Sequence, residues 1–383
     1  MEWFRTLRLR SSDPRVRRRA VEGLSSAGDA RSLDLLRTSL HDVDASVRSA
    51  AALALGTSLE ETALEPLIGA LRDQDVDVRR AAVEALERLN DTRAIGSLVI
   101  ALKDEGLMVR AAAAAALRRL GWRPTSNEEM ALYEIANGHT EAAAFVGEGA
   151  VQPLLDELRN DTVFKRRAAA QALEGVDDPR RIQPLLAALD DPEASVRVFA
   201  IHSLGRETDG GVTAALLRRA DDSDRQVRLA LAQVMTKRDD QHLVQFFLRW
   251  LSDRHFEVRL TAAEFLGRFP DPQIAQALLP VTRDSDIDVR RAAVKSLGVI
   301  GGVEAIETLV ISLTDEERLV RIAAEASLEQ IDPEWAQTTQ AQHAKARLEA
   351  SLNKCSPWVR SAVQQVLTRL AKATGRPPSQ IVP

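Results

Sequence analysis

The sequence predicts an all-α protein, a superhelical solenoid of about eleven stacked helical hairpins. One observation is a Val-Arg pair that recurs every 31 residues over most of the chain. A second is the composition, which is rich in the strong helix formers Ala, Leu, Arg and Glu and only 4% aromatic. A third is that each repeat contains two stretches with apolar residues at helical spacing. Because a single hairpin cannot bury its apolar face, such repeats must stack.

The Val-Arg pair fixes the boundaries of the repeats. The valines that precede an arginine in this register are Val16, Val47, Val78, Val109, Val196, Val227, Val258, Val289, Val320 and Val359. Lys165-Arg166 stands 31 residues before Val196, with lysine in the place of valine. Together these positions mark eleven repeats.

Each repeat is expected to form two helices joined by a short turn. The first has apolar residues at helical spacing, as in Leu64, Leu67 and Leu71. The second should begin at an acid three residues before the valine, whose carboxylate can accept hydrogen bonds from the free N–H groups of the first turn. These acids are Asp13, Asp44, Asp75, Asp224 and Asp286, with Glu193 and Glu317 in the same place. Glycine often follows the second helix and is expected to end it, as at Gly56, Gly121 and Gly267.

This pattern resembles the HEAT-like repeats named after phycobilin lyases, and the 31-residue consensus of artificial helical-repeat binders. The resemblance covers nearly the whole chain and implies an armadillo-type superhelix. It implies little about function, because such arrays serve many unrelated roles.

The repeats are interrupted twice. Val109 and Lys165 are 56 residues apart, which is 25 more than one repeat, and Val320 and Val359 are 39 apart. We therefore expect repeats 1–4 in residues 1–120, a helical insertion in 121–149 and repeats 5–10 in 150–331. A C-terminal capping repeat in 332–374 and a flexible tail in 375–383 complete the predicted organisation.

The insertion is expected to form two short helices, roughly 127–137 and 140–146. Ser126 and Glu129 form a capping-box pattern before the first, and Gly138 and Gly147 close the two. One interpretation is a degenerate repeat that keeps the stack continuous, and the other is a protruding element that contacts a partner. We favour the degenerate repeat.

The charge and cysteine content limit the classes of partner and compartment. The net charge of -5 gives no general attraction for nucleic acid. No apolar stretch approaches the length of a membrane span, and the single cysteine, Cys355, fits a reducing compartment such as the cytoplasm. Lysine fills only seven of the 51 basic positions, which suggests a bacterial source.

Residues with catalytic or metal-binding chemistry are not grouped in the sequence. The six histidines lie in six separate segments and none precedes a glutamate, unlike the iron-binding motifs of the HEAT-like deoxyhypusine hydroxylases. Nucleotide-binding and nucleophile motifs are not present in the sequence. An aspartate five residues before the valine recurs, and we interpret it with the repeated arginine as a structural ladder between neighbouring repeats. These aspartates are Asp42, Asp73, Asp104, Asp191, Asp222, Asp253, Asp284 and Asp315. We expect no cofactor and no metal.

The outward positions of the second helices are the remaining candidates for function. They lie directly before the repeat valine and two, three and six residues after it, and they are expected to line the concave face. In repeats 6–8 these positions and their neighbours form a candidate partner-binding surface of Val198, Phe199, His202, Leu229, Gln233, Phe256, Leu260 and Glu264. The alternative is that helix curvature places these side chains in the core between repeats.

A basic cluster at the N-terminal end is a second candidate. Arg15, Arg18 and Arg19 belong to a run of arginines with few acids beside it. A solvated cap is the commoner explanation for such a run, and the alternative is a docking site for an acidic partner surface or a phosphate backbone.

The function that these observations favour is a non-catalytic scaffold that binds another protein on its concave face. The alternative, which rests on the family resemblance alone, is a phycobilin lyase-like protein that handles a bilin or a similar cofactor. HEAT-like DNA glycosylases are disfavoured, because the basic residues do not line one face and the net charge is negative.

Overall fold

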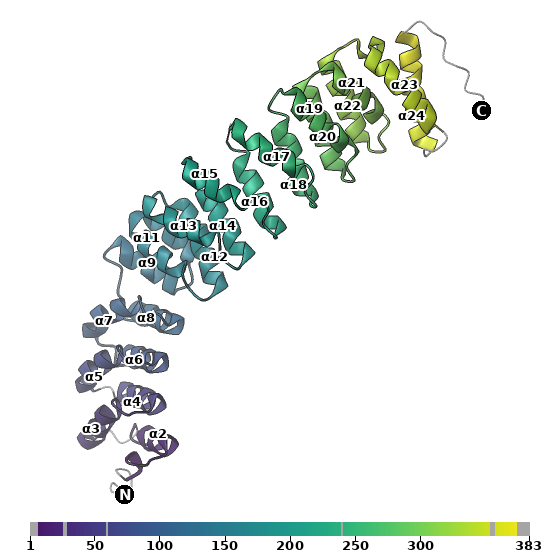
Figure 1. Cartoon of the computed structure of the whole chain (residues 1–383). Coiled ribbons are helices and arrows are strands. Elements are labelled where there is room, and N and C mark those ends of the chain that lie inside the picture. Colours follow the sequence, from purple (N-terminus) through teal and green to yellow (C-terminus); the bar gives the residue numbers. More distant parts are fainter. Residues whose placement is uncertain (1–6, 26–28, 59, 239, 353–356, 374–383) are drawn as a thin grey trace. The chain divides into compact units, whose positions relative to one another are not determined.

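The computed structural model describes residues 7–25, 29–58, 60–238, 240–352 and 357–373. Within these ranges the chain forms α-helices and short 3-10 helices and contains no strand, which confirms the predicted all-α solenoid of stacked hairpins (Figure 1). The chain divides into two compact halves, residues 1–188 and 189–383. Among the helices of the described part, none combines the length and apolar character needed to cross a bilayer. The predicted flexible tail and Cys355 lie outside the described residues.

The N-terminal half is a stack of hairpins in which first and second helices alternate along the chain. The first helices are α3 (Ala30–Ser39), α5 (Leu64–Ala70), α7 (Ile95–Ala101), α11 (Val151–Glu157) and α13 (Ile182–Ala188). The second helices are α2 (Pro14–Glu22), α4 (Ala45–Ser58), α6 (Val76–Leu89), α8 (Leu107–Arg119) and α12 (Val163–Ala172). Repeat valines such as Val47 and Val109 are buried, and they form one continuous core with the leucines of the first helices.

The insertion is part of this stack. It forms α9 (Asn127–Ala136), the single turn α10 (Thr140–Ala143) and a 3-10 segment, Ala144–Ala150. Helix α9 packs on α8 and α10 packs on α12, and Leu132 and Ala136 join the core of the preceding repeats. This arrangement favours the degenerate repeat over a protruding element. The hydroxyl of Ser126 accepts the N–H of Glu129 as expected, and the Glu129 carboxylate accepts from the N–H and the hydroxyl of Thr125.

The C-terminal half repeats the same hairpin. Its first helices are α15 (Gly210–Leu217), α17 (Val244–Trp250), α19 (Pro272–Leu278), α21 (Ile306–Ser312) and α23 (Thr339–Ser351). Its second helices are α14 (Ala194–Leu204), α16 (Arg225–Met235), α18 (Phe256–Leu266), α20 (Ile287–Ile300), α22 (Arg318–Ile331) and α24 (Pro357–Ala373). Trp335, which lies between α22 and α23, is fully buried.

Aspartate caps the second helices, but glutamate in the same place does not. The carboxylates of Asp75 and Asp286 each accept two N–H groups of the first turn, at 2.9 and 3.2 Å. Glu193 and Glu317 occupy the N-cap position without a side-chain hydrogen bond to the helix. The additional methylene of glutamate moves its carboxylate away from these N–H groups. The prediction of a carboxylate cap is therefore confirmed for aspartate and wrong for these two glutamates.

The glycines nine residues after the repeat valine allow neighbouring second helices to approach closely. Gly56 does not end α4 as predicted, since the helix continues to Ser58. A Cβ atom at Gly56 would lie 2.5 Å from the Cα of Ala85 in the next repeat. At Gly298 a Cβ would lie 2.6 Å from the Cβ of Ser327. Gly56 and Gly298 are thus needed for contact between repeats. Of the three glycines predicted to end a helix, Gly56, Gly121 and Gly267, Gly121 alone has a left-handed conformation, with φ +70°.

Candidate interaction surface

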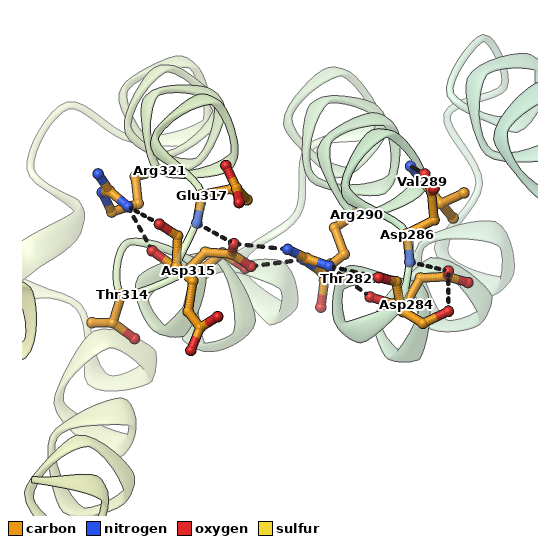
Figure 2. A network of polar contacts seen from close by, with 12 residues as sticks. Thr282, Asp284, Asp286, Val289, Arg290, Thr314, Asp315, Glu317 and Arg321 are labelled. Carbon is orange, nitrogen blue, oxygen red and sulfur yellow. Dashed lines mark hydrogen bonds and ion pairs between the residues drawn. The ribbon is translucent and has the colours of Figure 1, made fainter. Parts of the chain in front are cut away.

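Within each half, a ladder of largely buried ion pairs joins successive repeats. The guanidinium of Arg290 donates from Nε and Nη2 to both oxygens of Asp315, 25 residues later, at 2.9 and 3.1 Å (Figure 2). Its Nη1 donates to the backbone carbonyls of Asp284 and Ser285 in its own repeat. Asp315 Oδ1 also accepts the N–H of Glu317, so the same carboxylate closes its own turn. Each rung therefore fixes two turns and the distance between them.

The ladder has the same geometry in both halves. Nε–Oδ2 distances are 2.6–3.0 Å and Nη2–Oδ1 distances are 2.6–3.1 Å. The rungs are Arg17–Asp42, Arg48–Asp73 and Arg79–Asp104 in the N-terminal half, and Arg197–Asp222, Arg228–Asp253, Arg259–Asp284 and Arg290–Asp315 in the C-terminal half. The predicted structural ladder is confirmed for these pairs, and both groups of each pair are used in holding the fold.

Two aspartates of the ladder show how burial and hydrogen bonding act on the carboxyl group. At Asp253 and Asp284, burial by itself would raise the pKa of the carboxyl group. The hydrogen bonds from Arg228 and Arg259 and from the backbone N–H groups outweigh burial, so both pKa values lie below the ordinary value for aspartate. The hydrogen bond to Asp253 likewise raises the pKa of Arg228.

The ladder changes its chemistry where the insertion interrupts the repeat. Asn160 occupies the aspartate position and still closes its turn by accepting the N–H of Thr162 at 2.9 Å. Arg110 instead donates to Glu157, at the end of α11, at 2.8 Å. Lys165 Nζ lies 3.1 Å from the other oxygen of Glu157, and all three side chains are buried. Burial and the nearby charge of Arg110 lower the pKa of Lys165. Sequence reasoning noticed Lys165 but missed Glu157, which lies three residues before Asn160.

The predicted partner-binding residues lie on three consecutive second helices of the C-terminal half. Val198, Phe199 and His202 lie on α14, Leu229 and Gln233 on α16, and Phe256, Leu260 and Glu264 on α18. None of the eight is buried: Gln233, Phe256 and Glu264 are exposed and the other five are half-buried. Phe256 is 40% exposed, whereas Phe247 and Phe265 stack on each other at 3.8 Å inside the core. The structure thus separates core aromatic residues from those that reach the surface.

The basic N-terminal cluster is exposed on α2. Arg15, Arg18 and Arg19 all face solvent, and Arg18 Nε pairs with Glu22 Oε1 at 2.8 Å. The described residues contain no group of three or more metal-ligating side chains.

A trench on the second helices of the N-terminal half was not predicted from the sequence. It has a volume of about 660 Å³ and lies over α4, between α2 and α6. Its floor is made of the short side chains of α4, and its walls carry long charged side chains such as Arg18 and Arg80. The alternation of short and long side chains on neighbouring helices could have indicated it.

These observations define an α-solenoid whose hairpins are joined by a polar ladder. The HEAT-repeat family model matches residues 2–76, 64–132, 151–236, 213–284, 244–329 and 275–368. The chain belongs to the HEAT-repeat family. The match does not distinguish the phycobilin-lyase type from other HEAT repeats, and no curated protein matches the chain.

Several solved structures resemble the chain at low sequence identity. An engineered protein is 19% identical, with 96% of this chain and 98% of that chain covered and a TM-score of 0.28. Human deoxyhypusine hydroxylase in complex with glycerol is 20% identical, with 76% of this chain and 91% of that chain covered and a TM-score of 0.29. Kap95p, in a structure with RanGDP, is 13% identical, with 96% of this chain and 54% of that chain covered and a TM-score of 0.37. We draw no functional argument from these similarities.

Proposed function

We propose that this protein is a non-catalytic scaffold that binds another protein through the outward side of its second helices, here called the second-helix face. The observation that carries the proposal is the contrast between two adjacent positions of the repeat. Directly after the repeat valine, all eleven repeats have arginine. Two residues after the valine the side chain changes from repeat to repeat: Arg18, Ser49, Arg80, Ala111, Arg167, Val198, Leu229, Leu260, Arg291, Ile322 and Ser361. The fold requires the first position, and it leaves the second free for recognition.

The strongest part of this face for protein binding is the surface of α14, α16 and α18. Phe199, Leu229, Phe256 and Leu260 supply apolar area, with the polar side chains of Gln233 and Glu264 at its edge. Binding energy in protein interfaces is concentrated in a few aromatic and apolar residues surrounded by a polar rim. The single cysteine fits a reducing compartment, and we propose the cytoplasm as the location.

The test begins with isolation of a partner by affinity capture on the full-length protein. The variants Phe199→Ala and Phe256→Ala are then compared with the wild type for binding and for thermal unfolding. At a hot spot the loss of affinity should be about 2 kcal/mol or more with the melting curve unchanged. Phe265→Ala is the matched control, because Phe265 is buried and its truncation should cost about 3–5 kcal/mol of stability.

The outcome separates an interface from a core. If Phe199→Ala and Phe256→Ala lower the melting temperature as much as Phe265→Ala does, these side chains serve the core and this surface is rejected. If both variants fold normally and bind the partner as the wild type does, the partner uses another face.

A further inference from the structure

The trench over α4 has the dimensions of a binding site for an extended peptide. The outward side of α4 presents Ser46, Ser49, Ala50, Leu53 and Thr57, which are short or uncharged side chains. The helix has 14 residues, so the floor is roughly 20 Å long at a rise of about 1.5 Å per residue. An extended chain of about six residues spans that length. A whole helix is about 10 Å wide with its side chains, whereas an extended strand is narrower and fits a trench between adjacent helices more easily.

The walls of the trench are largely neutralised by their own ion pairs. Arg18 Nε binds Glu22 Oε1 at 2.8 Å on the α2 side. Arg80 Nη1 binds Glu84 Oε1 at 2.5 Å on the α6 side. These pairs hold the long side chains beside the floor. They leave little net charge along the middle of the trench.

The two ends of the trench have opposite charge. Asp44, Asp75 and Asp77 lie at the end where α4 and α6 begin. Hydrogen bonds from the hydroxyl and N–H of Ser46 lower the pKa of Asp44, so its carboxylate is charged at neutral pH. Arg88 lies at the other end, one residue before α6 ends, and is exposed. Along α6, Asp77 and Arg88 are separated by roughly 16 Å at a rise of about 1.5 Å per residue.

We propose that this trench binds an extended peptide segment of a partner protein that carries a basic and an acidic side chain about five positions apart. The basic side chain pairs with the aspartates at the start of α4 and α6, and the acidic one pairs with Arg88. Five extended residues span roughly 16 Å, which matches the distance between the two charged ends. The intervening residues lie on Ser49, Ala50 and Leu53, so they must be small. This inference rests on the proposed function and names the partner chemistry of one part of the second-helix face.

The test uses a phage-displayed library of random ten-residue peptides selected on the full-length protein. Enriched peptides should contain lysine or arginine about five positions from aspartate or glutamate. Ser49→Trp, which fills the floor, and Arg88→Glu, which reverses one end, should each weaken the enriched peptides by at least about fivefold. Gly69→Trp and Arg72→Glu are the matched controls: both positions are exposed and neither lines the trench, so binding should be unchanged.

Two results would overturn the proposal. One is that no peptide with this charge spacing is enriched. The other is that the enriched peptides bind Ser49→Trp and Arg88→Glu as tightly as they bind the wild type. Arg88 is exposed, so its variant remains informative even if Ser49→Trp folds poorly. Peptides that bind elsewhere on the second helices would leave the proposed function standing, whereas a protein that binds neither peptide nor partner would end both proposals.

Discussion

The ladder makes one prediction that the structure allows us to work out in detail, the effect of Asp253→Ala. Asp253 accepts from Nε and Nη2 of Arg228 at 2.7 and 3.0 Å, and its Oδ1 accepts the N–H of His255 at 2.9 Å. The two side chains of the pair are only 6% and 8% exposed. Removing the carboxylate leaves two guanidinium N–H groups without an acceptor in a place that water reaches poorly. Loss of one partner of a buried ion pair costs about 3–5 kcal/mol.

The same half of the chain contains a matched pair on the surface. Arg249 Nη2 binds both oxygens of Asp221 at 2.9 and 2.7 Å, so its bond lengths resemble those of the ladder. Its side chains are 60% and 75% exposed. An exposed ion pair contributes at most about 1 kcal/mol, because water solvates the charges when the pair is broken. Asp221→Ala should therefore have little effect, although the chemistry of the substitution is identical.

The assay must report locally, because repeat arrays can unfold in parts. Native-state hydrogen exchange of the amides in α16, α17 and α18 measures the free energy of opening around the rung. Asp253→Ala should lower it by about 3 kcal/mol or more, and Asp221→Ala by less than about 1 kcal/mol. Adding Arg228→Met to Asp253→Ala should recover part of the loss, since no charge is then left unpaired. Equal effects of the two aspartate substitutions would refute the assignment of stability to the buried ladder.

Other predictions concern pH, helix contact, the insertion and the N-terminal arginines. Asp73, Asp253 and Asp284 of the ladder have pKa values below the unfolded value of about 3.9. Their contribution to stability is therefore complete above that pH and is lost as the pH falls through the folded pKa values. Helical circular dichroism measured against pH should show a loss of helix below about pH 4, and the absence of an acid transition would contradict this. Gly298→Ala should lower the free energy of unfolding by about 1–3 kcal/mol in denaturant titrations, because the new Cβ would overlap Ser327. Gly69→Ala, with open space around the new Cβ, should not lower it. Lys165→Val restores the repeat residue but leaves Glu157 with one cation, so a thermal melt should show a lower rather than a higher stability. If the basic end of α2 docks an acidic partner, reversing Arg15, Arg18 and Arg19 to glutamate should weaken that partner's binding and flatten its salt dependence; unchanged binding leaves only the solvated cap.

The fold was predictable because the same physical constraint occurs in every repeat. Val47 and most of its equivalents are buried, seven of the repeat arginines bind the aspartate of the next turn, and eleven copies of the sequence pattern exclude chance. The exact role of glycine was not predictable in the same way. Gly56 lies where a helix could end, but its function is a contact with Ala85, which lies 29 residues away in the sequence. Only the packed structure shows which neighbour limits the size of a side chain.

The candidate surfaces were predictable in position but not in shape. Helical periodicity placed Phe199 and Phe256 on the outward side of the second helices, and the structure finds neither of them buried. The trench depends on the relative size of side chains on three adjacent helices, which periodicity within one repeat does not contain. Arg110 binds Glu157 rather than the residue at the aspartate position, Asn160, and this exchange of partner depends on how α9 and α10 pack between repeats. Both are properties of neighbouring repeats rather than of one repeat.

Different positions of the repeat serve the fold and the surface, which explains how a repeated fold can carry a specific surface. Each rung of the ladder joins the arginine after a repeat valine to a turn of the next repeat, so these bonds help to set the spacing of the helices. The outward position one residue further along makes no contribution to these bonds. Substitutions there can consequently alter recognition at little cost in stability, usually within about 0.5 kcal/mol for surface positions. Binding and stability should therefore be separable in this protein: variants of the trench floor and of the α14, α16 and α18 surface should change affinity, and variants of the ladder should change stability first.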